Sequence, residues 1–255
     1  MEEKRVEKTD LIVGRNAVLE ALQSGRAVDS VWVARGERTG SIGKILHLCR
    51  DKGIVIKEVD EKKLSFSCGH ANHQGVAAFA AAHEYAEVED IFALAAARGE
   101  APFLIICDEI EDPHNLGAIL RSAEAAGAHG VIIPKRRSAS LSYAVAKTSA
   151  GAIEYVPVAR VPNIPALLDE LKKRGVWIYA ADMDGQLWCD TDFSGAVALV
   201  IGSEGRGVGR LVKERCDFTV SLPMRGRINS LNASVAAGIL MFEVSRQRLK
   251  LGGVN

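Results

Sequence analysis

Three polar segments near the C-terminus hold the residue types that could do chemistry. Residues 202–209 are rich in glycine and follow an apolar run at 196–201. A second apolar run, 218–222, stops at Pro223, and the segment 230–234 (Ser-Leu-Asn-Ala-Ser) opens a helical pattern. Open α/β sheets bind ligands in such loops, beyond the carboxyl ends of their strands. The three segments therefore predict a ligand site.

The glycines of 202–209 do not match the common phosphate-binding patterns. No Gly-Lys-Ser or Gly-Lys-Thr follows them, as a P-loop requires. They also do not follow the first strand of a βαβ unit, where a dinucleotide fingerprint would stand. Taken alone, these glycines fit a surface turn as well as they fit a ligand loop.

An arginine lies on an earlier expected helix, 117–126. Arg121 and Glu124 are three positions apart, so their side chains can pair on the helix surface. Gly117 shares the face of Arg121, and a glycine there lets another backbone or a phosphate approach. The buried side is marked by Leu116, Ile119, Leu120 and Ala123. The pattern alone favours a solvated arginine on the surface of the helix.

Taken together, these segments resemble the three motifs of the SPOUT-class RNA 2′-O-methyltransferases of the SpoU/TrmH group. The first motif reads Asp108-Glu109-Ile110-Glu111-Asp112-Pro113-His114-Asn115-Leu116-Gly117 and runs on to Arg121. The second is Ile201-Gly202-Ser203-Glu204-Gly205, and the third joins Leu222-Pro223-Met224 to Ser230-Leu231-Asn232-Ala233-Ser234. The match covers roughly 102–248, extends into the N-terminal third, and is closest to bacterial 23S rRNA guanosine-2′-O-methyltransferases of the RlmB type.

The resemblance implies an enzyme that methylates a ribose 2′-hydroxyl of RNA with S-adenosylmethionine. It implies a guanosine of 23S ribosomal RNA as the substrate, with tRNA as the alternative. The residues at the family's catalytic positions are Asn115, Arg121, Glu204, Ser230 and Asn232. Those at its cofactor contacts are Gly202, Leu222 and Leu231, with Ile201 and Met224 as expected walls of the same pocket.

Methyl transfer to a hydroxyl is an in-line displacement, so the enzyme has to hold donor and acceptor close and aligned. It also has to provide for the loss of the proton from a weakly acidic sugar hydroxyl. The family assigns this proton to the arginine, but arginine is effectively always protonated. Arg121 can more easily stabilise the developing alkoxide, or bind the neighbouring phosphate, than accept a proton. Glu204, Ser230 and Asn232 are then expected to orient the substrate and the arginine.

Composition is that of an ordinary globular protein with one or two domains: 255 residues, 48% hydrophobic and 25% charged. The formal net charge is zero, so the overall charge does not indicate a nucleic-acid partner. The charge is uneven, however. Basic residues outnumber acidic ones between Glu204 and Arg227, Lys135-Arg136-Arg137 forms a second basic cluster, and the acidic segment 85–100 offsets both.

The five cysteines are odd in number and widely spaced, which argues against a disulfide framework and a zinc site. We therefore expect no metal and a reducing cytoplasm. The first five residues lack the apolar core of a signal peptide. No apolar run approaches the ~20 residues of a membrane span. We expect a cytoplasmic protein with no membrane partner.

Residues 1–82 are expected to form a small α/β domain. Helical patterns occupy 17–22, ending near Gly25, and 42–52, and strands are expected at 31–34, 54–56 and 76–81. The segment 72–78 matches the closing part of the L30e-like domain that the resembling methyltransferases carry as an RNA-binding module. The resemblance thus implies an L30e-like domain that binds RNA, and not DNA.

Residues 83–101 are expected to be a linker with a first short helix, and 102–255 the catalytic domain. Strands are expected at 103–107, 131–133, 176–180, 197–201 and 218–222, with helices at 117–126 and 164–174 and either helix or loop at 138–149. This alternation predicts an α/β fold with a mostly parallel sheet. The resemblance adds a trefoil knot near the C-terminus, which periodicity does not indicate.

The helix that begins near Ser230 is rich in small and apolar residues, so it can pack on more than one side. Val235, Ile239, Phe242 and Val244 are expected to mark one of its sides. The resemblance implies a homodimer with this helix at the interface. It also implies shared sites, with Arg121 of one subunit beside the Glu204 and Asn232 loops of the other.

Two other functions compete with this interpretation. A ribosome-assembly factor with a vestigial site would also bind RNA, but the complete set of Asn115, Arg121, Glu204 and Asn232 argues against it. A nicotinamide dehydrogenase would need a Gly-x-Gly-x-x-Gly after 103–107, and the sequence has none there. Binding of S-adenosylmethionine separates the enzyme from the assembly factor.

Overall fold

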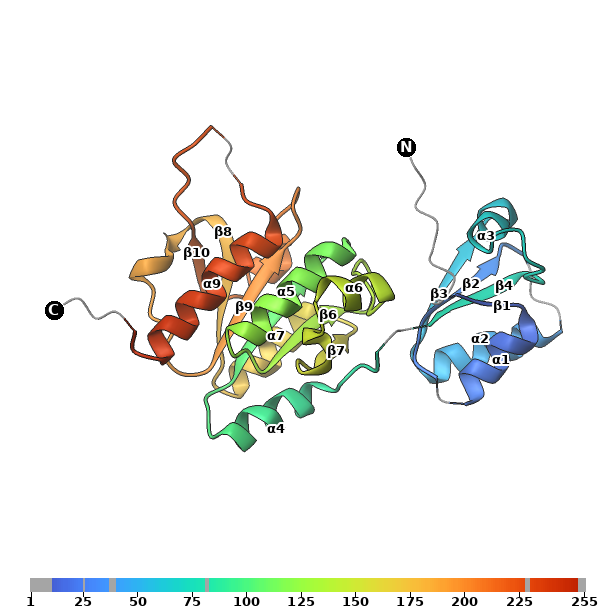
Figure 1. Cartoon of the computed structure of the whole chain (residues 1–255), viewed down its shortest axis with the longest axis horizontal. Coiled ribbons are helices and arrows are strands. Elements are labelled where there is room, and N and C mark those ends of the chain that lie inside the picture. Colours follow the sequence, from blue (N-terminus) through green and yellow to red (C-terminus); the bar gives the residue numbers. More distant parts are fainter. Residues whose placement is uncertain (1–10, 25, 37–39, 81–82, 228–229, 252–255) are drawn as a thin grey trace. The chain divides into compact units, whose positions relative to one another are not determined.

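The structure is a computed structural model that describes residues 11–24, 26–36, 40–80, 83–227 and 230–251 (Figure 1). These residues divide into two compact units, the first extending to Glu84 with the short segment Ser140–Tyr143, and the second comprising the rest. Each unit has its own sheet and hydrophobic core. The expected helix end near Gly25 and strand end at Ala81 lie outside the described residues. No helix within the described ranges is long and apolar enough to cross a membrane.

The first unit is built on a four-stranded sheet of order β1-β4-β2-β3. Its strands are β1 (Leu11–Val13), β2 (Val28–Ala34), β3 (Val55–Val59) and β4 (Val76–Ala80). Strand β4 pairs antiparallel with β1 and β2, whereas β2 and β3 are parallel. Side chains of a strand alternate between the two faces of its sheet. Val31 and Val33 accordingly face one core, and Trp32 and Ala34 the other.

Helices cover both faces of this sheet. The helices α1 (Arg15–Gln23) and α2 (Ser41–Asp51) bury their apolar sides against the core that contains Val31. Helix α3 (Glu61–Ser67) covers the opposite face with Leu64, which is fully buried. The pattern at 17–22 and 42–52 predicted α1 and α2, and α3 was not predicted.

The second unit contains a six-stranded sheet of order β10-β8-β9-β5-β6-β7 in which every neighbouring pair is parallel. Its strands are β5 (Phe103–Asp108), β6 (Gly130–Pro134), β7 (Val158–Val161), β8 (Trp177–Leu187), β9 (Val197–Gly202) and β10 (Phe218–Ser221). A parallel sheet is buried on both faces, so the sequences of its strands are continuous apolar runs. All six residues of β5 are buried. The predicted mostly parallel sheet is confirmed, with β7 as a strand that was not predicted.

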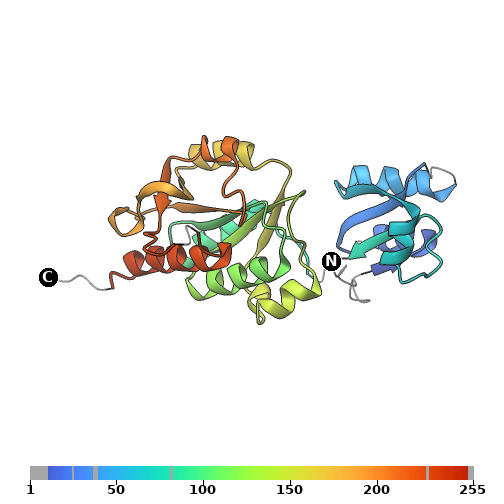
Figure 2. The same cartoon turned by 90° about the horizontal axis from the view of Figure 1, so that it is seen from above.

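Helices pack on both faces of the large sheet, as Figure 2 shows with the sheet between them. The helices α4 (Val88–Arg98), α7 (Ile164–Lys173) and α8 (Arg210–Lys213) belong to one core cluster with β5 and β9. The helices α5 (Pro113–Ala125) and α9 (Ala233–Arg248) pack against each other on the opposite face. Between β6 and β7 lie α6 (Tyr143–Thr148) and the 3₁₀ turn Ala152–Glu154, and a second 3₁₀ turn follows β8 at Trp188–Asp190.

Strand β8 leaves the regular ladder in its middle. Thr219 of β10 pairs with Ala180 of β8, but the next residue, Val220, pairs with Gln186. The intervening residues 181–185 therefore form an excursion from the sheet. Gly185 returns the chain so close to β10 that a Cβ atom there would lie 2.5 Å from the Thr219 carbonyl. The expected strand 176–180 is thus only the first half of β8.

Three expectations about helices need correction or completion. Helix α5 begins at Pro113 rather than residue 117, because Asp112 caps it and Pro113 suits the first helical position. The ambiguous stretch 138–149 contains α6. Val235, Ile239 and Phe242 lie exposed on α9, but Val244 is fully buried, because two residues turn a helix by more than half a circle. The knot stays a prediction.

Candidate functional site

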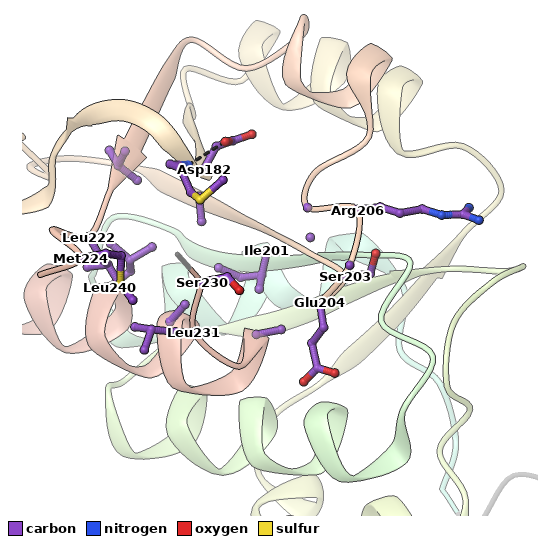
Figure 3. Close-up of a pocket in the computed structure, with 18 residues that line it drawn as sticks. Asp182, Ile201, Ser203, Glu204, Arg206, Leu222, Met224, Ser230, Leu231 and Leu240 are labelled. Atoms are coloured by element: carbon purple, nitrogen blue, oxygen red, sulfur yellow. Dashed lines mark hydrogen bonds between the residues drawn. The ribbon is translucent and has the colours of Figure 1, made fainter. Parts of the chain in front are cut away.

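The three polar segments converge beyond the carboxyl ends of β9 and β10, beside the middle of β8 (Figure 3). They enclose a pocket of about 360 Å³, a size in the range of small-molecule sites. Among the residues that line it are seven of the predicted site residues: Ile201, Gly202, Glu204, Leu222, Met224, Ser230 and Leu231. Met224 and Leu231 keep more than a third of their surface exposed. Exposed apolar side chains around a cavity indicate a binding surface.

The glycine-rich loop folds back on its own strand. The N–H of Gly207 donates to the carbonyl of Ser203 at 2.8 Å, and the two residues form an isolated antiparallel bridge. Gly202 lies under this turn, where a Cβ atom would be 2.0 Å from the carbonyl carbon of Gly207. Only glycine fits at position 202 without displacing the loop. Gly202 thus permits a close backbone approach that a side chain would prevent.

One residue from each motif joins a hydrogen-bonded network at the edge of this pocket. The Asn115 amide donates to Glu204 Oε1 at 2.8 Å. The Asn232 amide donates to Asn115 Oδ1 at 3.0 Å and also to Glu204 Oε1. Asn115 is buried, and Glu204 and Asn232 are exposed. Asn115 and Asn232 are 117 positions apart in the sequence, with Glu204 between them, and the fold brings the three side chains into contact.

Two helix N-termini position this network. Asn232 is the N-cap of α9, and its Oδ1 accepts from the N–H groups of Ser234 at 3.0 Å and Val235 at 3.3 Å. Asn115 stands in the first turn of α5, whose N-cap Asp112 accepts from the His114 N–H at 2.9 Å. The N-terminal ends of α5 and α9 therefore bring the two asparagine amides to the carboxyl group of Glu204.

Asp108 ties the end of β5 to the far end of the glycine-rich loop. Its Oδ2 accepts from the Gly209 N–H at 2.8 Å, and its side chain is buried. Burial raises the pKa of Asp108 above its usual range, although the hydrogen bond from Gly209 opposes this shift. The contact fixes where the loop returns to the sheet before α8.

Arg121 lies apart from the pocket within one chain. It is exposed on α5 and does not line the cavity. Within the part of the chain that the structure describes, it has no ion-pair or hydrogen-bond partner, so the expected pair with Glu124 is not formed. Gly117, on the same face, contacts protein instead: a Cβ there would lie 2.6 Å from Thr148 Cβ on α6. The buried side of α5 is as predicted.

The excursion of β8 supplies pocket residues that the sequence pattern missed. Ala181, Asp182 and Met183 line the cavity. Burial opposes ionisation of Asp182, but the 2.8 Å hydrogen bond from Lys213 and the N–H of Met183 lower its pKa. The polar run Asp182-Met183-Asp184-Gly185 directly after an apolar strand was the available signal. Within the described residues, no three His, Cys, Asp or Glu side chains gather as a metal site.

Comparison with known proteins identifies relatives of both units. The profile of the SpoU rRNA methylase family matches residues 102–242. A second profile, described as RNA 2′-O ribose methyltransferase substrate binding, matches residues 11–86. A protein of Bacillus subtilis (strain 168), named as a TrmH family tRNA/rRNA methyltransferase, is 49% identical over 95% of this chain and 98% of its own length.

Two solved structures are similar in fold. An rRNA methyltransferase from Sinorhizobium meliloti with bound AdoMet has a TM-score of 0.58 and 25% identity, and the match covers 94% of this chain and 87% of that one. A TrmH/SpoU tRNA-modifying enzyme of A. aeolicus has a TM-score of 0.54 and 28% identity, and the match covers 59% of this chain and 76% of that one.

Proposed function

The chain belongs to the SpoU rRNA methylase family, and on that premise we propose that it methylates a guanosine of 23S ribosomal RNA. It is an RNA 2′-O-methyltransferase that uses S-adenosylmethionine. The observation that carries the proposal is the network of Asn115, Glu204 and Asn232 at the edge of the pocket. This network places polar groups for an acceptor beside a cavity for a cofactor.

The residues of the pocket fit S-adenosylmethionine. Apolar side chains from three loops, among them Leu222, Met224 and Leu231, can enclose an adenine ring. The carboxylate of Asp182 can accept hydrogen bonds from the ribose hydroxyls or the amino group of the cofactor. Gly202 lets the cofactor approach the backbone of the loop. We assign Ile201, Gly202, Leu222, Met224 and Leu231 to cofactor binding on these grounds.

S-adenosylmethionine, when bound, supplies an electrophilic methyl group, and the protein has to align the acceptor hydroxyl with it. Both asparagine amides donate to Glu204 Oε1. Among the described residues no group donates to Glu204 Oε2, so this oxygen can accept a hydrogen bond from the 2′-hydroxyl. Ser230 lines the same cavity and adds a hydroxyl for orientation. The role of Glu204 in this proposal is to orient the acceptor.

A homodimer accounts for the exposed position of Arg121. Val235, Ile239 and Phe242 form an exposed apolar stripe along α9, and an apolar stripe of this kind suits a subunit interface. Helix α9 packs on α5, the helix that carries Arg121. In a two-fold dimer through α9, Arg121 of each subunit reaches the partner's Glu204 and Asn232 loops. The protonated guanidinium then stabilises the developing alkoxide.

Ribosomal RNA is the substrate we favour over tRNA. The rRNA methyltransferase of S. meliloti matches over 94% of this chain, which includes both units. The tRNA-modifying enzyme matches over 59%, a share that the second unit can supply alone. We propose residues 1–82 as the RNA-binding domain, 83–101 as a linker with the first helix, and 102–255 as the catalytic domain. The protein then works in the cytoplasm, where its RNA substrate is.

Mapping of 2′-O-methyl groups tests the function. Ribosomal RNA and tRNA are isolated from cells with and without the gene, and methylated riboses are located by sequencing. We expect one guanosine of 23S rRNA to lose its methyl group in the deletion strain and to regain it when the gene is restored. Loss at a tRNA position instead would identify the alternative substrate. Unchanged methylation in both RNAs would refute the proposal.

A further inference from the structure

A second cavity of about 360 Å³ lies on the other side of the segment Ser203-Glu204-Gly205-Arg206. These four residues line both cavities, so the segment is a partition between them. The far wall of the second cavity consists of 109–112, Asn115 and Arg137. The Asn115–Glu204 hydrogen bond therefore stands where the cofactor pocket and the second cavity meet.

The second cavity has a rigid frame. Glu109 and Arg137 form an ion pair of 2.7 Å across it. Both residues have left-handed backbone conformations, with φ of 58° and 54°. Side chains other than glycine adopt such conformations at a cost, and these conformations gather at binding and catalytic sites. The ion pair joins the two loops at the wall of the cavity.

Most charges in the second cavity already have protein partners. Glu109 and Arg137 neutralise each other, Asp112 caps α5, and Glu204 accepts from two amides. Two charged side chains are left. In the part of the chain that the structure describes, neither Glu111 nor Arg206 has a hydrogen-bond or ion-pair partner. Figure 3 shows Arg206 extending away from the apolar cluster of Leu222, Met224 and Leu240 in the cofactor pocket.

We propose that the second cavity receives the acceptor nucleotide, with Glu111 on the guanine base and Arg206 on its phosphate. This inference rests on the proposed function and specifies how that site selects its substrate. Guanine presents two adjacent donors, N1–H and the N2 amino group, and a carboxylate can accept both. The other three standard RNA bases lack such a pair of donors. Bases of single-stranded RNA are recognised through these edges.

The second contact follows from the position of the 2′-hydroxyl in RNA. This hydroxyl is adjacent to the 3′-phosphate of its own nucleotide. With the hydroxyl at Glu204, the phosphate lies near the partition, where Arg206 offers a planar guanidinium with five donors. Charge-assisted contacts of arginine with phosphate are strong and frequently bidentate. Glu111 on the far wall and Arg206 on the partition thus supply one acidic and one basic side chain for the two ends of a guanosine nucleotide.

The test uses the full-length protein, labelled S-adenosylmethionine and 23S rRNA transcribed in vitro. Glu111→Gln keeps the size of the side chain but replaces one acceptor by a donor. We expect it to lower kcat/KM for guanosine methylation by roughly 10- to 100-fold, the cost of a lost bidentate base contact. Affinity for S-adenosylmethionine should not change. Glu170→Gln is the matched control, because Glu170 is exposed on α7 and lines neither cavity.

Arg206→Gln should raise KM for the RNA about tenfold and reduce the salt slope of RNA binding by about one. Arg210→Gln is its control, because Arg210 lies outside both cavities and pairs with Glu214. Wild-type kinetics in both Glu111→Gln and Arg206→Gln would overturn this inference and leave the methyltransferase intact. Arg206→Gln could also bind S-adenosylmethionine more weakly. If this weaker binding accounts for the whole loss of methylation activity, the phosphate contact is overturned. A wild-type enzyme that binds S-adenosylmethionine but methylates no RNA would overturn the proposed function itself.

Discussion

The side chain of Asn115 donates a hydrogen bond to Glu204 across 89 residues of sequence, at 2.8 Å. Asn115 is buried at the start of α5, whereas Glu204 is exposed in the loop after β9. The bond therefore fixes an exposed carboxylate through a buried amide. Without it, only the Asn232 amide would hold Glu204 at the junction of the two cavities.

Asn115→Ala is expected to lower single-turnover methyl transfer by at least about 100-fold, as the loss of one orienting donor does in other enzymes. The free energy of unfolding should fall by only about 1 kcal/mol. Asn163→Ala is a matched control, because it removes the N-cap of α7 at a similar cost of about 1 kcal/mol far from the pocket. Equal activity losses in the two variants would trace the effect to stability alone.

Gly202→Ala is expected to abolish binding of S-adenosylmethionine in calorimetry. The new methyl group would lie 2.0 Å from the carbonyl carbon of Gly207, so the loop has to move. Overpacking of this kind costs about 1–3 kcal/mol of stability. Gly205→Ala should leave the melting temperature almost unchanged, because a Cβ there meets no atom within 4 Å. Normal cofactor affinity in Gly202→Ala would contradict the close approach.

His129 should make the protein less stable in mild acid. It is fully buried, its Nδ1 accepts from the Phe103 N–H at 2.9 Å, and burial lowers its pKa despite the opposing effect of Glu100. The unfolded state therefore binds more protons than the native state once pH falls below the unfolded pKa of about 6.5. The stability from the neutral ring is complete above that pH and is lost below it.

Urea unfolding between pH 8 and pH 5 measures this loss. For the wild type we expect stability to fall as pH drops below 6.5, with a slope of at most about 1.4 kcal/mol per pH unit for this one proton. His129→Gln should be less stable at pH 8 and should lack this contribution to the slope. The same slope in both proteins would show that another group is responsible.

Ile239→Glu should convert the proposed dimer into monomers and abolish activity. Ile239 lies in the middle of the exposed apolar stripe of α9, where a carboxylate at an interface would be buried without a partner. Light scattering gives the oligomeric state. Tyr155→Glu is the control, because Tyr155 is 72% exposed and lies far from α9 in sequence. A fully active monomer would end the dimer proposal.

Mixed dimers test the shared site directly. Arg121→Ala and Asn232→Ala subunits should each be inactive alone but should regain part of the activity when combined. In such a mixed dimer one of the two sites has both residues intact. No recovery in mixed dimers of verified composition would place Arg121 and Asn232 in the same subunit's site, or outside the reaction.

Deletion of residues 1–82 should weaken RNA binding and reduce its dependence on salt, since phosphate contacts release counterions. Cofactor affinity should persist, because every residue that lines the cofactor pocket lies between Ala181 and Leu240. Filter binding at several salt concentrations and calorimetry measure the two effects. The opposite result, lost cofactor affinity with normal RNA binding, would refute the domain assignment.

The large sheet could be predicted because burial leaves a continuous signal in the sequence. Strand β5 is apolar from Phe103 to Cys107, since helices cover both of its faces. Strand β7 and helix α3 were missed because their apolar signal is weak: α3 buries only Leu64, and Arg160 interrupts the apolar residues of β7.

The candidate site was predictable where a loop directly follows a strand, as at Gly202 and Leu222. Asp182 was missed because its place depends on the shift in pairing between Thr219 and Val220. This shift arises when β8 and β10 pair, so the sequence of one strand alone does not predict it. The helical pattern indicated that Arg121 is on the exposed side of α5, and the structure confirms this position. Local patterns specify which face of a helix is buried, and they do not specify what its other face meets.

Helix α9 also joins parts of the second unit that are far apart in the sequence. Arg248, at its end, donates to the carbonyls of Ala101 and Pro102 at 2.8 and 3.0 Å and to Gly195 at 2.8 Å. Asn232, at its beginning, completes the network with Asn115 and Glu204. A nascent chain emerges from its N-terminus, so these contacts form last. We expect a chain in which α9 has not yet packed to lack a complete site, because Asn232 is then missing from the network.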